Sequence, residues 1–193
     1  MEKRELKTKA KKGLSLQDLL LTAVLLAAGA VLKFFAGTFI NLFGMKPNFI
    51  IAMYCMAIVL IRPKIYYSII IGLLAGAICQ FFPGTPYLNF GSELAGALAM
   101  GLLIMIPAKN KTVEIVLAAV STFISTVISG GLYVVLLFVF IKSDPSAMVA
   151  YVPIVLGTAT LNTIIVALLY VPLMKVLKKP FISDAKKEAA DNE

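Results

Sequence analysis

The chain has 193 residues, of which 60% are apolar, and its mean hydropathy is +0.94. Runs of about 20 apolar residues are the length that crosses a bilayer, so this composition predicts an integral membrane protein. We attribute the formal net charge of +8 to membrane topology and contact with lipid, and we expect no nucleic-acid partner. A chain of this length forms one domain, with no room for a soluble catalytic domain.

Six apolar stretches separated by short connections make up most of the sequence. Long apolar runs without alternation favour helices over β-barrel strands. We therefore predict an all-α bundle of six transmembrane helices. Their expected ranges are Leu16–Ala36, Asn48–Ile61, Ile65–Phe82, Gly91–Pro107, Val113–Ile141 and Val149–Val176. In this prediction residues 16–177 form the transmembrane substrate-binding domain, residues 1–15 a basic N-terminal tail and residues 178–193 a polar C-terminal tail.

Lysine and arginine are distributed unevenly between alternate connections. Fifteen of the 18 fall in the N-terminal tail, the second-to-third connection, the fourth-to-fifth connection and the C-terminal end. Cationic loops stay on the cytoplasmic side of a membrane. We therefore expect a multi-pass protein of the cell membrane with both termini in the cytoplasm.

The sequence lacks the residue patterns of several enzyme classes. It has no histidine, no glycine-rich phosphate loop and no acidic cluster, which argues against nucleotide hydrolysis and metal-assisted hydrolysis. We predict that the protein is not an enzyme and needs neither a cofactor nor a metal. Cys55 and Cys79 fall within apolar stretches and are interpreted as small core residues.

Ionisable residues inside apolar stretches are rare and are candidates for function. Lys33 lies near the outer end of the first stretch, and Glu93 lies near the start of the fourth. They can pair with each other or with a zwitterionic ligand. The alternatives are that Lys33 reaches the outer headgroups, and that Glu93 is favoured by the dipole at its helix N-terminus.

Uncharged polar residues add further candidates. Asn162 is expected at mid-depth in the sixth stretch, where its amide needs a partner. That partner is either a ligand or a neighbouring helix. Tyr133 and Asn89 are expected in the outer half, where they can line a pocket. The serine stripe from Ser121 to Ser129 is interpreted as helix packing.

Two outer connections and one helix face complete the pattern. The connections Gly37–Pro47 and Phe82–Phe90 are apolar and aromatic, as expected either of lids over a pocket or of an aromatic belt at the headgroups. Small residues recur at four-residue spacing, as in Ala23 and Ala27 or Gly72 and Gly76. Such faces allow close helix approach, either within the bundle or, on the first helix, to another membrane protein.

The segments GMKPNFIIAMYCMAIVLIRP (Gly44–Pro63) and LNTIIVALLYVP (Leu161–Pro172) are similar to those of a known family. With six helices of this length, they make residues 14–180 resemble the substrate-binding S component of energy-coupling factor (ECF) transporters. Among these proteins the tryptophan-transport branch is the most similar.

This resemblance implies a mechanism. An S component captures a small solute from outside, here tryptophan or a related aromatic or vitamin-like compound. It delivers the solute through a membrane-embedded T protein driven by two cytoplasmic ATPases. By resemblance, Ala23 and Ala27 match the alanine motif that meets the T protein.

The pocket candidates are Lys33, Asn89, Glu93, Tyr133 and Asn162, in a membrane protein otherwise surrounded by lipid. The main alternative function is a self-sufficient secondary carrier or permease. A membrane enzyme and a scaffold subunit without a substrate are further alternatives.

Overall fold

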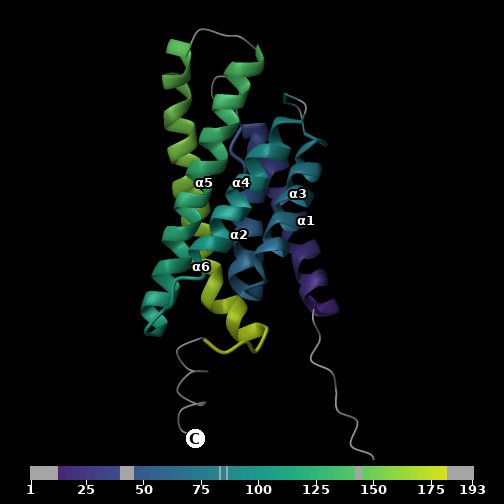
Figure 1. Cartoon of the computed structure of the whole chain (residues 1–193), viewed down its shortest axis with the longest axis vertical. Helices are drawn as coiled ribbons and strands as arrows, with labels where there is room; N and C mark the ends of the chain where they lie inside the picture. The colour runs from purple at the N-terminus through teal and green to yellow at the C-terminus, as the bar shows by residue number, and fades with distance from the viewer. Residues whose placement is uncertain (1–12, 40–45, 83, 86, 142–144, 182–193) are drawn as a thin grey trace, which may run out of the picture.

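The computed structural model describes residues 13–39, 46–82, 84–85, 87–141 and 145–181. Most of both predicted tails, Lys142, and residues 40–45 of the first outer connection therefore lie outside the described residues. Within these ranges the protein is all-helical (Figure 1). The helices are α1 (Leu16–Phe39), α2 (Ile50–Ile61), α3 (Ile65–Cys79), α4 (Leu88–Leu103), α5 (Lys111–Ile141) and α6 (Val152–Val176), with a 3-10 helix η1 (Pro145–Tyr151) before α6.

The all-α prediction is confirmed, and each predicted stretch contains one α-helix. Three segments are long and apolar enough to cross a membrane by themselves: Leu16–Phe35, Lys111–Phe140 and Met148–Val176. The helices α2, α3 and α4 are shorter than the others. The crossing of the membrane by all six helices stays a prediction.

Several predicted helix ends were wrong by a few residues. Helix α3 ends at Cys79 because the following amides bond to carbonyls three residues back, as Phe82 N does to Cys79 O at 3.1 Å. Helix α4 begins at Leu88, earlier than expected, and similar tight turns after Leu103 end it before Pro107. Tightened last turns of this kind are common at helix ends, and apolar composition does not reveal them.

Polar caps set the starts of two long helices. Ser15 Oγ accepts a hydrogen bond from Asp18 N at 3.1 Å, and Asp18 Oδ2 accepts one from Ser15 N at 3.3 Å, which is a reciprocal capping box before α1. Asn110 Oδ1 accepts a hydrogen bond from Val113 N at 2.9 Å at the start of α5. Each cap satisfies a backbone N–H that has no partner within its own helix.

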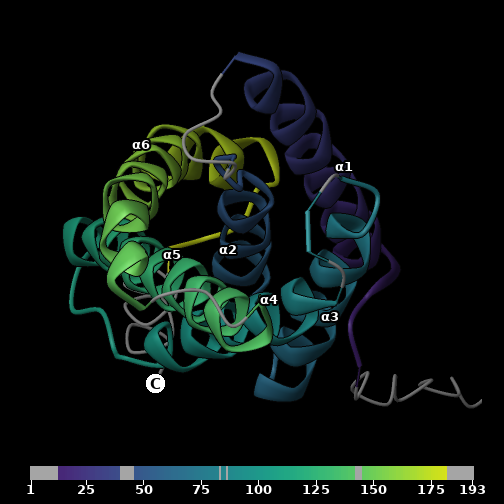
Figure 2. The same cartoon turned by 90° about the horizontal axis from the view of Figure 1, so that it is seen from above.

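Helix α2 forms the centre of the bundle. Eleven of its 12 residues are buried, and it contacts α1, α3, α4, α5 and α6. Figure 2, seen from above, shows the other helices around it. An apolar sequence on all sides of a short helix fits this enclosed position, because no face of α2 needs to meet water or lipid.

Helices α3 and α4 pack closely through small residues. A Cβ added to Gly72 would lie 2.7 Å from Ala97 Cβ and 2.8 Å from the carbonyl oxygen of Glu93. Only glycine fits at that distance, so the predicted packing role of Gly72 is confirmed. This contact fixes the backbone of α4 at Glu93.

Two charged clusters lie at the end of the bundle where α1 begins and α6 ends (Figure 1). The buried Glu114 forms an ion pair with Arg62 at 3.0 Å and accepts a hydrogen bond from Tyr170 Oη at 2.8 Å. Lys179 pairs with Asp18 at 3.1 Å and donates to the carbonyl oxygen of Leu60 at 3.1 Å. These contacts connect the ends of α1, α2, α5 and α6.

Candidate functional site

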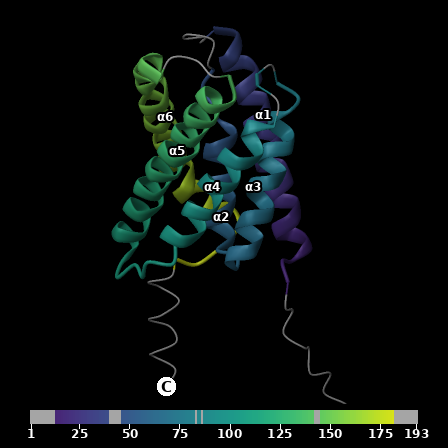
Figure 3. The same cartoon turned by 45° about the horizontal axis from the view of Figure 1, so that its top comes forward.

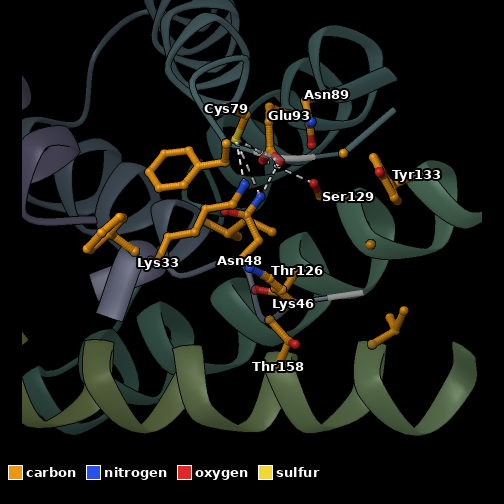
Figure 4. A pocket seen from close by; sticks show the side chains of 16 residues that line it. Lys33, Lys46, Asn48, Cys79, Asn89, Glu93, Thr126, Ser129, Tyr133 and Thr158 are labelled. Carbon is orange, nitrogen blue, oxygen red and sulfur yellow. Dashed lines mark hydrogen bonds between the residues drawn. The ribbon is translucent and has the colours of Figure 1, made fainter. Parts of the chain in front are cut away.

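A cavity of about 210 Å³ lies near the opposite end of the bundle. All six α-helices or the turns next to them contribute to its wall (Figure 4). The lining residues are Lys33, Phe34, Lys46, Asn48, Ile51, Cys79, Phe82, Gly84, Asn89, Glu93, Thr126, Ser129, Gly130, Tyr133, Val155 and Thr158.

Lys33 enters this cavity from α1 and is 9% exposed. Its Nζ lies 3.2 Å from the Sγ of Cys79 and 5.1 Å from the centroid of the Phe82 ring. Among the described residues, no carboxylate lies within 4.0 Å of this ammonium group. A thiol and an aromatic face are weak partners for a buried cation.

Glu93 faces the same cavity from α4 and is 1% exposed. Asn48 Nδ2 donates to Glu93 Oε1 at 2.5 Å, and Ser129 Oγ donates to Oε2 at 3.1 Å. These partners are neutral. Cys79 Sγ lies 4.0 Å from Oε1 and 3.2 Å from Lys33 Nζ, so the sulfur is close to both the buried carboxylate and the buried ammonium group.

Helices α5 and α6 form the other side of the cavity. Thr126, Ser129, Gly130 and Tyr133 line it from α5, at the spacing that places residues on one helix face. Thr158 faces them from α6 (Figure 4), and Val155 of the same helix also lines the cavity. This wall combines aliphatic and aromatic surface with hydroxyl groups, whereas the buried charges Lys33 and Glu93 come from α1 and α4.

Four of the five predicted pocket residues line this cavity: Lys33, Asn89, Glu93 and Tyr133. The fifth, Asn162, is fully buried directly behind the lining. Its Nδ2 donates to the carbonyl oxygen of Asn48 at 3.1 Å and to Thr126 Oγ1 at 3.4 Å. The roles of all five in binding stay predictions.

The lining also includes polar residues that were not among the pocket candidates: Lys46, Asn48, Cys79, Thr126, Ser129 and Thr158. Ser129, which was interpreted as helix packing, donates a hydrogen bond to Glu93. Asn48 hydrogen-bonds to both Glu93 and Asn162. In the sequence it could be recognised only as a polar residue two positions before the most apolar helix, α2. Cys79 is 1% exposed, as expected of a core residue, but its sulfur contacts Lys33. Cys55, in contrast, is fully buried in the core of α2.

The second outer connection contributes to the site. Phe82 and Gly84 line the cavity, whereas Phe81 is 87% and Tyr87 75% exposed. Gln80 Oε1 accepts a hydrogen bond from Tyr87 N at 3.1 Å, which fixes the position of the connection relative to α3. Its aromatic residues therefore divide between the cavity and the outer surface.

Helix α1 presents small residues on two faces. Gly29 packs inward, since an added Cβ would lie 2.9 Å from the Cα of Ile50. Ala23 and Ala27 face outward and are exposed. Among the described helices α1 contacts only α2 and α3, and Figure 3 shows it at the edge of the bundle. The predicted docking alanines are thus accessible.

Comparison with known proteins agrees with this arrangement. The model of the family "Tryptophan transporter TrpP" matches residues 15–178. A "Probable tryptophan transport protein" of Clostridium acetobutylicum is 26% identical over 171 residues, which cover 87% of this chain and 98% of the relative. One of Bacillus subtilis (strain 168), with the same description, is 26% identical over 174 residues, covering 89% and 98%. No solved structure matches the chain.

The tryptophan-transport branch predicted from the sequence is therefore confirmed. The apolar helices agree with a transport protein of the membrane. Because the family model covers most of the sequence, the chain belongs to the tryptophan transporter TrpP family.

Proposed function

We propose that this chain is the substrate-binding S component of an ECF importer and that it captures tryptophan from outside the cell. The observation that supports this proposal most strongly is the pair of buried charges in one cavity. Lys33 and Glu93 are each at most 9% exposed, and they are not paired with each other. Buried charges without partners are costly, especially in a membrane protein.

A free amino acid supplies both missing partners. Its carboxylate can accept hydrogen bonds from Lys33, and its ammonium group can donate to Glu93. Each charge-assisted contact contributes about 1.5–3 kcal/mol. The remaining side chain then extends towards the wall of α5 and α6, where Tyr133 and Val155 offer apolar surface. This arrangement favours a zwitterion with an aromatic side chain.

The charges at the two ends of the bundle support inward transport. In the proposed topology all six helices cross the membrane and both termini are cytoplasmic, because Arg62, Lys109 and Lys179 lie at the end opposite the cavity. The cavity then faces outward. Because the sequence has no Walker motif, energy would come from the T protein and its two ATPases, and Ala23 and Ala27 would form the docking surface.

Calorimetry of the purified full chain tests the binding proposal. We expect one tryptophan bound per chain. Tryptamine, which lacks the carboxylate, and indole-3-propionate, which lacks the ammonium group, should each bind roughly tenfold to a hundredfold more weakly. Absence of tryptophan binding, or equal affinity for the three compounds, would refute the proposal.

A second experiment separates the S component from a self-sufficient carrier. Vesicles containing only this chain should accumulate no labelled tryptophan. Vesicles that also contain the T protein and both ATPases should accumulate it when ATP is present inside. Accumulation by the chain alone would overturn the S-component role and establish a secondary carrier.

A further inference from the structure

Asn162 carries a buried acceptor that has no donor. The residue is fully buried on α6, and its Nδ2 is held by the carbonyl oxygen of Asn48 at 3.1 Å and by Thr126 Oγ1 at 3.4 Å. Its Oδ1 has no hydrogen-bond partner within the described residues. Buried amide oxygens without partners are rare, and each one calls for an explanation.

The surroundings of Asn162 place its amide next to the cavity. Both residues that it contacts, Asn48 and Thr126, line the cavity, and so does Thr158 one turn earlier on α6. Figure 4 shows Thr126 and Thr158 together, on the side away from Cys79. Asn162 itself does not line the cavity, so contact between its amide and a bound side chain requires Asn48 or Thr126 to shift when the ligand binds.

Asn48 relates this acceptor to the charged end of the site. Its backbone carbonyl binds Asn162, and its side chain donates to Glu93 at 2.5 Å. Asn48 therefore connects the Glu93 carboxylate to the Asn162 amide through its own hydrogen bonds. The Oδ1 of Asn48 also lacks a partner, so the site has two unpaired amide oxygens, one beside Glu93 and one behind the α5–α6 wall.

We propose that the Oδ1 of Asn162 accepts a hydrogen bond from the indole N–H of bound tryptophan. This inference rests on the proposed function. Tryptophan has two donor groups, the ammonium group and the indole N–H, and each of the two unpaired amide oxygens can accept a hydrogen bond from one of them. Glu93 and the Oδ1 of Asn48 receive the ammonium group, which leaves Asn162 for the indole.

The hydroxyl groups nearby are less suited to this role. Thr126 already donates to the carbonyl oxygen of Thr122 at 2.8 Å and accepts from Asn162. Hydroxyls also donate as readily as they accept, so they discriminate poorly between ligands. A buried carbonyl oxygen left without a donor penalises any ligand that lacks the N–H. Asn162 would thereby make the site selective for indole over phenyl and thiophene rings.

The test compares tryptophan with 3-(benzothiophen-3-yl)alanine, in which sulfur replaces the indole N–H with little change of shape. Calorimetry on the purified full chain should show the analogue binding roughly tenfold to a hundredfold more weakly than tryptophan. In Asn162→Leu the two affinities should agree to within about a factor of two, the error expected for independent changes. Thr160→Val, an exposed polar-to-apolar change on the same helix, should keep the wild-type ratio.

The ratio of the two affinities distinguishes recognition from structural support. If Asn162 only positions Asn48, its replacement weakens the binding of both ligands equally. The ratio of their affinities then stays at the wild-type value, which would overturn the inference. Equal binding of both ligands by the wild-type chain would overturn it too, while the tryptophan-binding function would stand. If the wild-type chain binds no tryptophan, the inference and the proposed function both fail.

Discussion

Two buried glutamates in this protein have opposite surroundings. Glu114 is 1% exposed and has a cation at 3.0 Å, Arg62, together with the Tyr170 hydroxyl. Glu93 is equally buried, but within the described residues the groups that donate hydrogen bonds to its carboxylate are neutral, among them Asn48 and Ser129. Under the proposed function, the protein compensates the first charge itself and a ligand compensates the second. We therefore expect Glu114 to serve stability and Glu93 to serve binding.

Replacing Glu93 by glutamine should weaken tryptophan binding. The change keeps the size of the side chain and its ability to accept hydrogen bonds, but it removes the charge that attracts the ammonium group. We expect the dissociation constant to rise roughly tenfold to a hundredfold, the contribution of one charge-assisted contact. Titration calorimetry on the purified chain measures it, and thermal stability should not fall, because an unpaired buried charge is removed.

Glu114→Gln makes the same chemical change at the other end of the bundle and is the matched control. Its affinity for tryptophan should equal that of the wild type. Its unfolding temperature should fall, because Arg62 loses its partner. The loss should be smaller than the about 3–5 kcal/mol of fully buried pairs, since the Arg62 side chain is 22% exposed. An affinity loss in Glu114→Gln as large as in Glu93→Gln would contradict the separation of roles.

At the scale of elements, close helix contacts position the binding residues. Gly72 on α3 touches the backbone of α4 at Glu93, so the distance between these helices sets the place of the carboxylate. Gly131 on α5 has no neighbour within 4 Å of an added Cβ. Both glycines lie in apolar helices, and the sequence does not distinguish them. Packing requires glycine only at position 72.

Gly72→Ala should destabilise the protein, whereas Gly131→Ala should not. The new methyl group at position 72 would lie 2.7 Å from Ala97 Cβ, and overpacking of this kind costs about 1–3 kcal/mol. At position 131 alanine fits and reduces the freedom of the unfolded chain, for a gain of about 0.4–1 kcal/mol. Thermal unfolding in one detergent compares the variants, and equal unfolding temperatures would show that α3 and α4 can move apart freely.

The outward alanines of α1 form a separate surface from the cavity. Changing both Ala23 and Ala27 to leucine adds bulk where a partner helix would approach. Tryptophan affinity of the isolated chain should stay at the wild-type value, because neither residue lines the cavity. ATP-driven uptake by vesicles with the T protein and ATPases should be lost.

Gly157→Leu is the control for added bulk, since Gly157 is exposed on α6 with no neighbour within 4 Å. We expect uptake by this variant to match the wild type. Normal uptake by the double alanine variant would instead assign Ala23 and Ala27 to contact with lipid.

For the whole molecule, apolar runs were enough to predict the helices and their order. They were also enough to mark Lys33 and Glu93, because charges stand out against an apolar background. Asn48 and Glu114 were harder to recognise, since both lie where a span begins and look solvated in the sequence. The burial of Glu114 and the hydrogen bonds of Asn48 depend on the central position of α2 and on the approach of α4, α5 and α6, which are contacts between distant segments. Periodicity within one helix contains no information about those contacts.

The distribution of charge over the whole bundle leads to the last prediction. At the end of the bundle where α1 begins, the described cations include Arg62, Lys109 and Lys179. The cations described near the other end, Lys33 and Lys46, both line the cavity. By the positive-inside rule the first end is cytoplasmic. A membrane-impermeant maleimide should therefore label Thr85→Cys in intact cells.

Lys109→Cys should react with the same reagent only after the cells are permeabilised. The native Cys55 and Cys79 are 0% and 1% exposed, so the parent chain should give little background. Lys109 is chosen because it is exposed and its replacement leaves the Asn110 cap of α5 intact. Labelling of position 109 from outside would invert the topology. The cavity would then open to the cytoplasm, and capture of an external solute by Lys33 and Glu93 would be impossible.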